Sequence, residues 1–210
     1  VLRYAFTRKG LLTTAPGNVS ASIKVMPGVA TPDVQFAFAP ASYVGGQLGV
    51  LDDFPGMTCG VWQHRLVSRR SIHLASTDPE VQPSICPNYL TDVIDQDTMI
   101  GGLRKVREIF SQPALAKYVD IETVPGPEVQ TDAEILDFAR RTGNTVYHPI
   151  GTCKMGTDPM AVVDPELKLH GLDRLRVVDA SVMPLMPSAN TNAAVLMIAE
   201  KAADMIKAAN

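Results

Sequence analysis

The chain has 210 residues, of which 46% are hydrophobic and 20% are charged, and its formal net charge is −3. This composition excludes an intrinsically disordered chain and predicts one large or two small globular domains. The small negative charge provides no basic field for binding nucleic acid. The sequence contains no run of about 18 apolar residues, so no transmembrane segment is predicted. Three cysteines do not make a disulfide framework, so we expect a reducing compartment, the cytoplasm.

The first part of the chain predicts short strands separated by proline-rich turns. Apolar and polar side chains alternate over residues 20–26, 34–38 and 60–68, which is typical of half-buried strands. Residues 71–75 could return as the hairpin partner of the third run. We therefore expect a mainly antiparallel sheet with irregular loops.

A helical period replaces the alternation from residue 95 onward. Asp95 or Asp97 is available as an N-cap. Gly101 and Gly102 lie inside this helix and cost roughly 2 kcal/mol of helix propensity relative to alanine. Another element is therefore expected to pack closely against them. The apolar stripe at positions i, i+4, i+7 and i+11 comprises Met99, Leu103, Val106 and Phe110.

Two further helices and one strand are predicted downstream. Thr131 and Glu134 have the spacing of a capping box, so a helix is expected to run from there to about Gly143. Residues 175–178 predict a short strand that ends at Asp179. Residues 193–207 predict a strong helix, apolar on every face over its first two turns.

His148 is the first candidate for chemistry because it lies outside any periodic segment. The proline after it favours an extended backbone, and Gly151 marks a turn. The ordinary pKa of histidine lies near neutrality, so an imidazole on a rigid loop can act as a general base. A histidine that is simply hydrogen-bonded within its loop is the alternative. Metal binding is not expected, because Cys153 has no second cysteine or histidine at ligand spacing.

The loop before the last helix is the second candidate. Asn190, Thr191 and Asn192 lead into this helix, whose first N–H groups and positive dipole end favour a negatively charged group in front of it. The alternative is that one of these side chains is an ordinary N-cap. Asp179 at the end of a strand could bind a ribose or ribityl hydroxyl.

Several nucleotide and hydrolase motifs are missing from the sequence. There is no Gly-x-Gly-x-x-Gly fingerprint, no P-loop and no Gly-x-Ser-x-Gly elbow. The residues alone therefore predict an α+β protein with a possible histidine-centred site.

Read together and in order, these segments resemble a known family. Residues 147–156 read Tyr-His-Pro-Ile-Gly-Thr-Cys-Lys-Met-Gly, residues 175–184 read Leu-Arg-Val-Val-Asp-Ala-Ser-Val-Met-Pro, and residues 190–193 read Asn-Thr-Asn-Ala. This order resembles the C-terminal region of glucose–methanol–choline (GMC) flavin oxidoreductases. The runs at residues 54–58 and 87–90 are similar to the choline-dehydrogenase-like branch.

The resemblance implies an FAD enzyme that oxidises an alcohol to an aldehyde or ketone. It implies that His148 accepts the hydroxyl proton while hydride passes to flavin N5, and that Asn192 holds the substrate oxygen. Tyr147 is implied as a wall of the substrate pocket. The positions implied to contact the cofactor are Asp179, Ala180, Asn190, Thr191 and Ala193.

The resemblance also implies the domain organisation. Residues 1–145 would be the C-terminal part of a substrate-binding domain with a mainly antiparallel sheet and flanking helices, and residues 146–210 would complete the FAD-binding domain with a strand and a helix. The N-terminal Rossmann-type portion that holds FAD is absent from this sequence. We therefore expect that portion as the partner of the chain and expect the isolated chain to be inactive. Two alternatives are a non-catalytic partner module with the same fold and a flavoprotein lyase.

Overall fold

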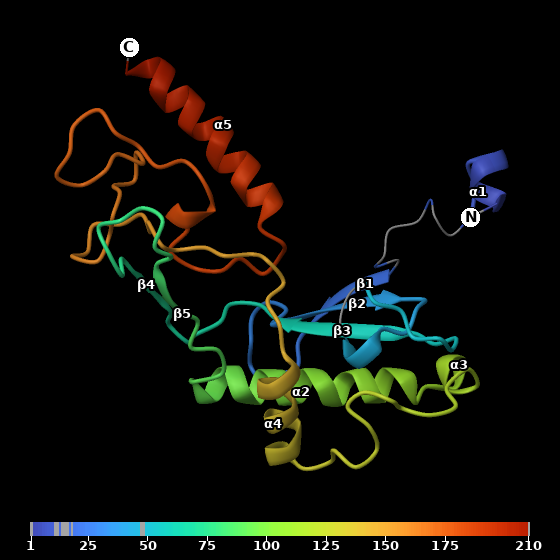
Figure 1. Ribbon diagram of the computed structural model, residues 1–210. Helices are drawn as coiled ribbons and strands as arrows, with labels where there is room; N and C mark the ends of the chain where they lie inside the picture. Colours follow the sequence, from blue (N-terminus) through green and yellow to red (C-terminus); the bar gives the residue numbers. More distant parts are fainter. Residues whose placement is uncertain (1, 11–12, 14–16, 18, 47–48, 210) are drawn as a thin grey trace. The chain divides into compact units, whose positions relative to one another are not determined.

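The computed structural model describes residues 2–10, 13, 17, 19–46 and 49–209. The chain divides into two compact units, a first unit of Val1–Gln63 with Val93–Asn144 and a second unit of His64–Asp92 with Thr145–Asn210. Helices and small antiparallel sheets make up the structure, so the predicted α+β fold class is confirmed (Figure 1). The expected start of the first domain at residue 1 lies outside the described residues. The assignment of the two domains to substrate and FAD remains a prediction.

The first unit contains a three-stranded antiparallel sheet. Its strands β1 (Val19–Ile23), β2 (Val34–Ala39) and β3 (Thr58–Gln63) neighbour one another in that order. The alternation read from the sequence therefore predicted all three strands. This unit also contains α1 (Leu2–Thr7) and a short 3₁₀ helix at Val44–Gly46.

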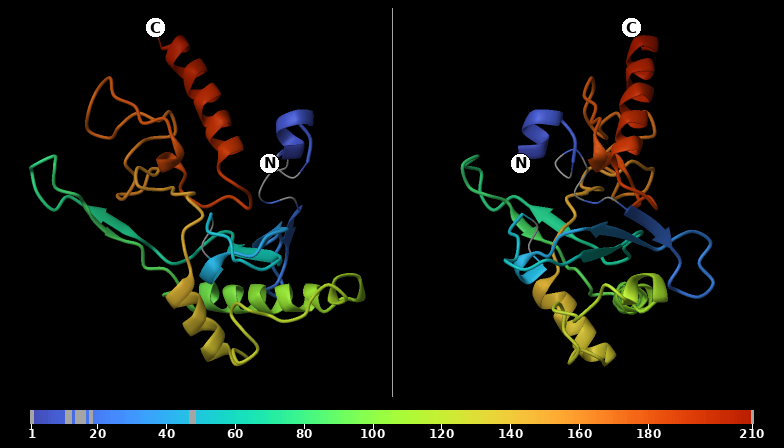
Figure 2. Two further views of the ribbon diagram at one scale, coloured as in Figure 1. Left: turned by 45° about the vertical axis from the view of Figure 1, so that its right-hand side comes forward. Right: turned by 90° about the vertical axis from the view of Figure 1, so that its right-hand side faces the viewer.

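Helix α2 (Val93–Phe110) covers one face of this sheet, as both views in Figure 2 show. Val34 and Phe36 of β2 are completely buried, and the ring of Phe38 lies 5.8 Å from the ring of Phe110. Because neighbouring residues of a strand point to opposite faces, the alternate residues of β2 form the apolar side that meets α2.

Two helices follow α2 in the first unit. Helix α3 (Pro113–Ala116) is short, and α4 (Asp132–Thr142) begins with the predicted capping box between Thr131 and Glu134. Ile135 of α4 is 1% exposed, and α4 contacts α2.

Three local expectations for residues 60–97 were wrong. Asp95 does not cap α2: it is the third residue of the helix, is fully buried, and accepts a hydrogen bond of 2.7 Å from Gln63 Nε2. The third strand ends at Gln63 because Arg65 has a left-handed φ of 53°, which a strand does not accommodate. β4 (Ser71–His73) pairs with β5 (Ser84–Cys86) and not with β3, which stays an edge strand of its own sheet, because the left-handed turn at Arg65 ends β3 before the chain reaches β4.

The second unit contains the β4–β5 ribbon, a 3₁₀ helix (Ala180–Val182) and α5 (Asn192–Ala208). The expected strand at residues 175–178 is reduced to a single bridge between Lys168 and Arg176. The left-handed φ of 61° at Arg174 turns the chain immediately before it. Among the helices of the described ranges, none combines the length and apolar character needed to span a bilayer.

The hydrophobic core of the second unit joins segments that are distant in sequence. Its buried members are Val163, Leu167, Val182, Met183, Ile198 and Ala202. These residues come from the loops after residue 155, the 3₁₀ helix region and α5, so burial of one cluster orders all three.

Substitution of Gly101 and of Gly102 by alanine is expected to change the free energy of unfolding differently. A Cβ atom at position 102 would lie 2.9 Å from Val61 Cγ2 of β3, whereas a Cβ at position 101 would lie 3.4 Å from Val25. We expect Gly102→Ala to lower the free energy of unfolding by about 1–3 kcal/mol through overpacking. We expect Gly101→Ala to leave it unchanged or raise it by up to about 1 kcal/mol, because alanine favours the helix. Urea denaturation checks both, and equal effects of the two variants would contradict the close approach at Gly102.

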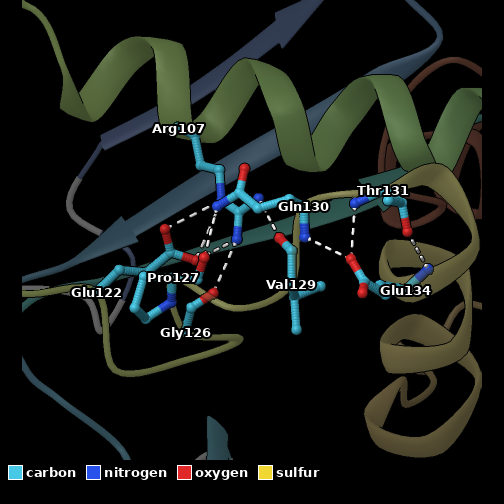
Figure 3. A network of polar contacts seen from close by, with 8 residues as sticks. All are labelled: Arg107, Glu122, Gly126, Pro127, Val129, Gln130, Thr131 and Glu134. Atoms are coloured by element: carbon cyan, nitrogen blue, oxygen red, sulfur yellow. Dashed lines mark hydrogen bonds and ion pairs between the residues drawn. The ribbon is translucent and has the colours of Figure 1, made fainter.

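Arg107 of α2 is the centre of a polar network that holds the loop between α3 and α4 (Figure 3). Its guanidinium donates to both carboxylate oxygens of Glu122, at 2.8 to 3.1 Å, and to the carbonyl oxygens of Gly126 and Val129, at 3.1 and 2.6 Å. The side chains of Arg107 and Glu122 are 24% and 31% exposed. A charged donor with three partners in one partly buried place stabilises a loop more than an exposed ion pair does.

Arg107→Met is therefore expected to lower the free energy of unfolding by about 1–3 kcal/mol, because the carbonyl and carboxylate groups lose their shared donor. Arg104→Met is the matched control on the same helix. Arg104 pairs with Asp132, and both side chains are more than half exposed, at 54% and 64%. Its loss should change the free energy of unfolding by less than about 1 kcal/mol. Equal denaturation midpoints for the two variants would show that the network does not stabilise the loop.

Candidate functional site

His148 lies in an irregular segment after α4, in the second unit. Its side chain is half-buried, and within the described part of the chain its imidazole has no hydrogen-bond partner. The reading of His148 as a histidine hydrogen-bonded within its own loop is therefore not supported. An imidazole with free nitrogen atoms can accept or donate a proton at a bound ligand.

The residues after His148 are held against the 3₁₀ helix. The backbone N–H of Cys153 donates to the Ser181 carbonyl at 3.0 Å, and that of Met155 donates to the Val182 carbonyl at 2.8 Å. Gly151 has a φ of 84°, and a Cβ placed on it would lie 3.4 Å from the Met183 carbonyl oxygen. The predicted turn at Gly151 therefore brings the His148 segment to residues 181–183.

Helix α5 begins at Asn192, one residue earlier than predicted, and Asn192 is exposed. Thr191 occupies the N-cap position and is 8% exposed, but its side chain makes no capping hydrogen bond. The first turn of α5 also contains no acidic residue. An ordinary N-cap therefore does not explain this loop, and the helix end keeps its preference for a negatively charged group.

The loop before α5 is anchored within the second unit. Arg65 Nε donates to Ser188 Oγ at 2.6 Å, two residues before Asn190. Asn190 and Ala193 are both exposed on either side of the N-cap. These two predicted contact positions are thus accessible at the start of the helix.

Asp179 and Ala180 lie at the start of the 3₁₀ helix. One carboxylate oxygen of Asp179 accepts a hydrogen bond of 2.7 Å from the Ser181 N–H, so this side chain caps the short helix. Ala180 packs against the hydrophobic core. The capping contact occupies Oδ1 of the exposed Asp179.

Ser181 is a candidate that the sequence interpretation missed. Its Oγ atom is buried and has no hydrogen-bond partner among the described residues. A buried hydroxyl without a partner costs free energy, so such a group commonly awaits a ligand or another part of the protein. Its position two residues after Asp179, within the run at 175–184, was the available signal.

The core brings the three candidate segments together. Ile150, Ala180 and Ala194 all pack against the same buried cluster. His148 precedes the first of these residues by two positions, Asp179 precedes the second by one, and Asn192 precedes the third by two. The backbone therefore gathers the segments of His148, Asp179 and Asn192 around one core.

Tyr147 differs from the other candidates. Its side chain is 74% exposed, its φ of 60° lies in the left-handed region, and its N–H donates to Thr145 Oγ1 at 3.0 Å. A bulky residue in this region is uncommon and is often found at functional sites. The assignment of Tyr147 as a wall of the substrate pocket stays a prediction.

The described residues contain no set of side chains that could bind a metal ion. Over residues 2–10, 13, 17, 19–46 and 49–209, no group of three or more His, Cys, Asp or Glu side chains could hold a metal ion. Burial raises the pKa of the Cys59 thiol to about 12, so this side chain stays protonated and is a poor ligand near neutral pH. The imidazole of His170 contacts the Gly156 carbonyl at 3.1 Å, which is a structural role.

An open depression also lies in the second unit, between Asp164 and residues 168–176. It contains none of the candidate residues. Its Lys168 pairs with Glu166, and its Arg176 donates to the Glu166 carbonyl. Lys168 and Arg176 are therefore engaged within the protein, and Arg174 also lines the depression. We assign no ligand to it.

Comparison with known proteins shows which family this chain belongs to. Residues 67–199 match the family GMC oxidoreductase. The chain is 43% identical over 203 residues to an alcohol dehydrogenase [acceptor] of Pseudomonas putida, covering 97% of this chain and 37% of that protein. It is 41% identical over 206 residues to an oxygen-dependent choline dehydrogenase of Pseudomonas aeruginosa, covering 98% of this chain and 36% of that protein. The chain thus spans little more than a third of the length of these curated relatives.

Solved structures agree with the sequence match. A pyridoxine 4-oxidase from Mesorbium loti superposes with a TM-score of 0.79 at 31% identity, covering 88% of this chain and 36% of that one. A formate oxidase of Aspergillus oryzae RIB40, studied for its FAD modification, superposes with a TM-score of 0.79 at 28% identity, covering 87% of this chain and 32% of that one. The segments around His148, Asp179 and Asn192 all lie within the matched residues 67–199. The chain belongs to the GMC oxidoreductase family.

Proposed function

We propose that this chain is the C-terminal part of an FAD-dependent oxidoreductase that oxidises an alcohol to an aldehyde or ketone, with His148 as the base. The observation that carries this proposal is the single core that packs Ile150, Ala180 and Ala194 and so gathers the segments of His148, Asp179 and Asn192. The names of the relatives, an alcohol dehydrogenase and choline dehydrogenases, support an alcohol as the class of substrate.

The residues around this core suit a flavin. The start of α5 has no side-chain cap and no acidic residue, which favours an electron-rich ring edge in front of it. The buried Ser181 Oγ has no hydrogen-bond partner among the described residues, and the exposed Asp179 carboxylate lies two residues before it in the chain. Asn190, Thr191 and Ala193 surround the helix start, and Asp179 and Ala180 would contact the ribityl and phosphate region. When bound, FAD would supply the acceptor for the hydride that leaves the alcohol carbon.

The chain itself would supply the proton chemistry. The half-buried imidazole of His148 has no competing partner in the described structure, so it is available to accept the proton of the alcohol hydroxyl. The amide of Asn192, exposed at the first position of α5, would donate a hydrogen bond to the same oxygen and hold it in place. Tyr147 would then line the entry for substrate once the rest of the enzyme is present.

The FAD-binding fingerprint is missing from this sequence, so the test needs a longer protein. We define the joined protein as this chain fused behind the part of the Pseudomonas putida relative that the match leaves uncovered. We expect the joined protein to purify with bound flavin and the isolated chain to bind little. Stoichiometric, tight FAD binding by the isolated chain would contradict our view that most of the cofactor site lies elsewhere.

His148→Ala in the joined protein is expected to slow alcohol-dependent flavin reduction by about 10²- to 10⁴-fold, because the hydroxyl proton loses its acceptor. Flavin content should remain unchanged. His170→Ala is the control, since its imidazole contacts the Gly156 carbonyl in a structural role. Anaerobic stopped-flow absorbance measures the rate. Undiminished reduction in His148→Ala would refute the assignment of the base.

Asn192→Ala is expected to slow the same reduction by about 10²-fold, as for the loss of one positioned hydrogen-bond donor. Alanine is well tolerated in the first turn of a helix, so α5 should keep its stability. Flavin content and the circular dichroism spectrum serve as internal controls. A variant that binds flavin normally and turns over at the unchanged rate would remove Asn192 from the site.

A further inference from the structure

The β4–β5 ribbon of the second unit has two apolar positions directly opposite each other. Ser71–His73 pairs with Ser84–Cys86, and Ile72 faces Ile85 across the two strands. Within the described ranges this sheet has only these two strands (Figure 2). Side chains opposite each other in an antiparallel pair lie on the same face.

The apolar face of this ribbon is open. Ile72 is 45% exposed, Ile85 is 63% exposed, and Leu74, which follows Ile72 at the i+2 position, is 89% exposed. The alternate positions are Ser71, His73, Ser84 and Cys86, so the opposite face is polar. An isolated two-stranded ribbon is only marginally stable in water. Exposed apolar side chains that lie together commonly mark a surface that another part of a protein contacts.

Polar contacts hold the base of the ribbon but leave that face free. Arg70 lies over the Tyr89 ring at 4.3 Å and donates from Nε to the Pro87 carbonyl at 3.1 Å. Asn88 Nδ2 donates to the Arg69 carbonyl at 3.1 Å. The two strands are therefore joined next to the start of β4 and the end of β5, and Ile72 and Ile85 lie farther along the ribbon.

The length of the relatives indicates what covers this face. The family match begins at residue 67 and so includes the residues of this ribbon, and the matched residues make up only 37% and 36% of the two Pseudomonas relatives. A second copy is disfavoured, because three side chains are far fewer than the roughly 20–30 residues a side of a stable protein–protein interface. A covalently connected segment needs no such area, since its effective concentration is high.

We propose that Ile72, Leu74 and Ile85 form a docking face for the N-terminal portion of the complete polypeptide, which presents an apolar surface to it. This inference rests on the proposed function, because it takes the chain to be the C-terminal part of a longer flavoenzyme. It adds a specific contact between the ribbon and that portion.

The experiment compares the isolated chain with the joined protein, each as wild type and as Leu74→Ser with Ile85→Ser. We expect the double variant to lower the melting temperature of the joined protein by about 4–8 °C, because two buried side chains lose apolar contact. In the isolated chain the melting temperature should shift by less than about 1 °C, since the same side chains are exposed. His73→Ser, on the polar face of the same strand, is the matched control and should change neither protein.

Hydrogen exchange of residues 71–86 provides the second readout, with slower exchange expected in the joined protein than in the isolated chain. Equal exchange in the two proteins, or an unchanged melting temperature in the joined double variant, would overturn the docking face. Dimerisation of the isolated chain that Leu74→Ser with Ile85→Ser abolishes would assign the face to a second copy and would also overturn it. If the ribbon exchanges hydrogen slowly but the joined protein contains no flavin, the proposed function is refuted and the docking face is not. If alcohol reduces the flavin but the ribbon exchanges as fast as in the isolated chain, the docking face is refuted and the proposed function is not.

Discussion

Burial of Val182 and Met183 against α5 is the interaction on which the candidate site depends. These two residues follow the 3₁₀ helix, and they pack in one cluster with Ile198 and Ala202. The loop after His148 donates backbone hydrogen bonds to residues 181 and 182, so its position follows from the same packing. Loss of this core would separate all three candidate segments at once, although none of the core residues takes part in the chemistry.

A different principle stabilises the first unit. There, α2 packs so closely on β2 and β3 that Gly102 leaves no room for a Cβ atom beside Val61. On the same helix, Arg107 holds the following loop through a carboxylate and two carbonyl groups. Close apolar packing on the sheet and a charged network on the loop together stabilise the first unit.

Local sequence patterns predicted those strands and helix ends that depend mainly on their own residues. Alternation predicted β1, β2 and β3, and the Thr131–Glu134 capping box predicted the start of α4. These local patterns did not show which strands pair with each other. Residues 71–73 could pair with either neighbour as far as their side chains show, and only the structure shows that they pair with β5. Asp95 likewise has the residue type of a cap, but only the approach of Gln63 shows that it is a buried acceptor.

The sequence by itself determined the α+β class, the membership of the family through its ordered motifs, and the identity of His148, Asp179 and Asn192 as candidates. Motifs of this kind are visible because each needs a particular residue type at a particular spacing. The tertiary structure alone decided that the three segments share one core, that Thr191 does not cap α5, and that the Ser181 hydroxyl is buried without a hydrogen-bond partner among the described residues. These facts depend on contacts between residues far apart in the chain, and no local pattern encodes which distant groups become neighbours on folding.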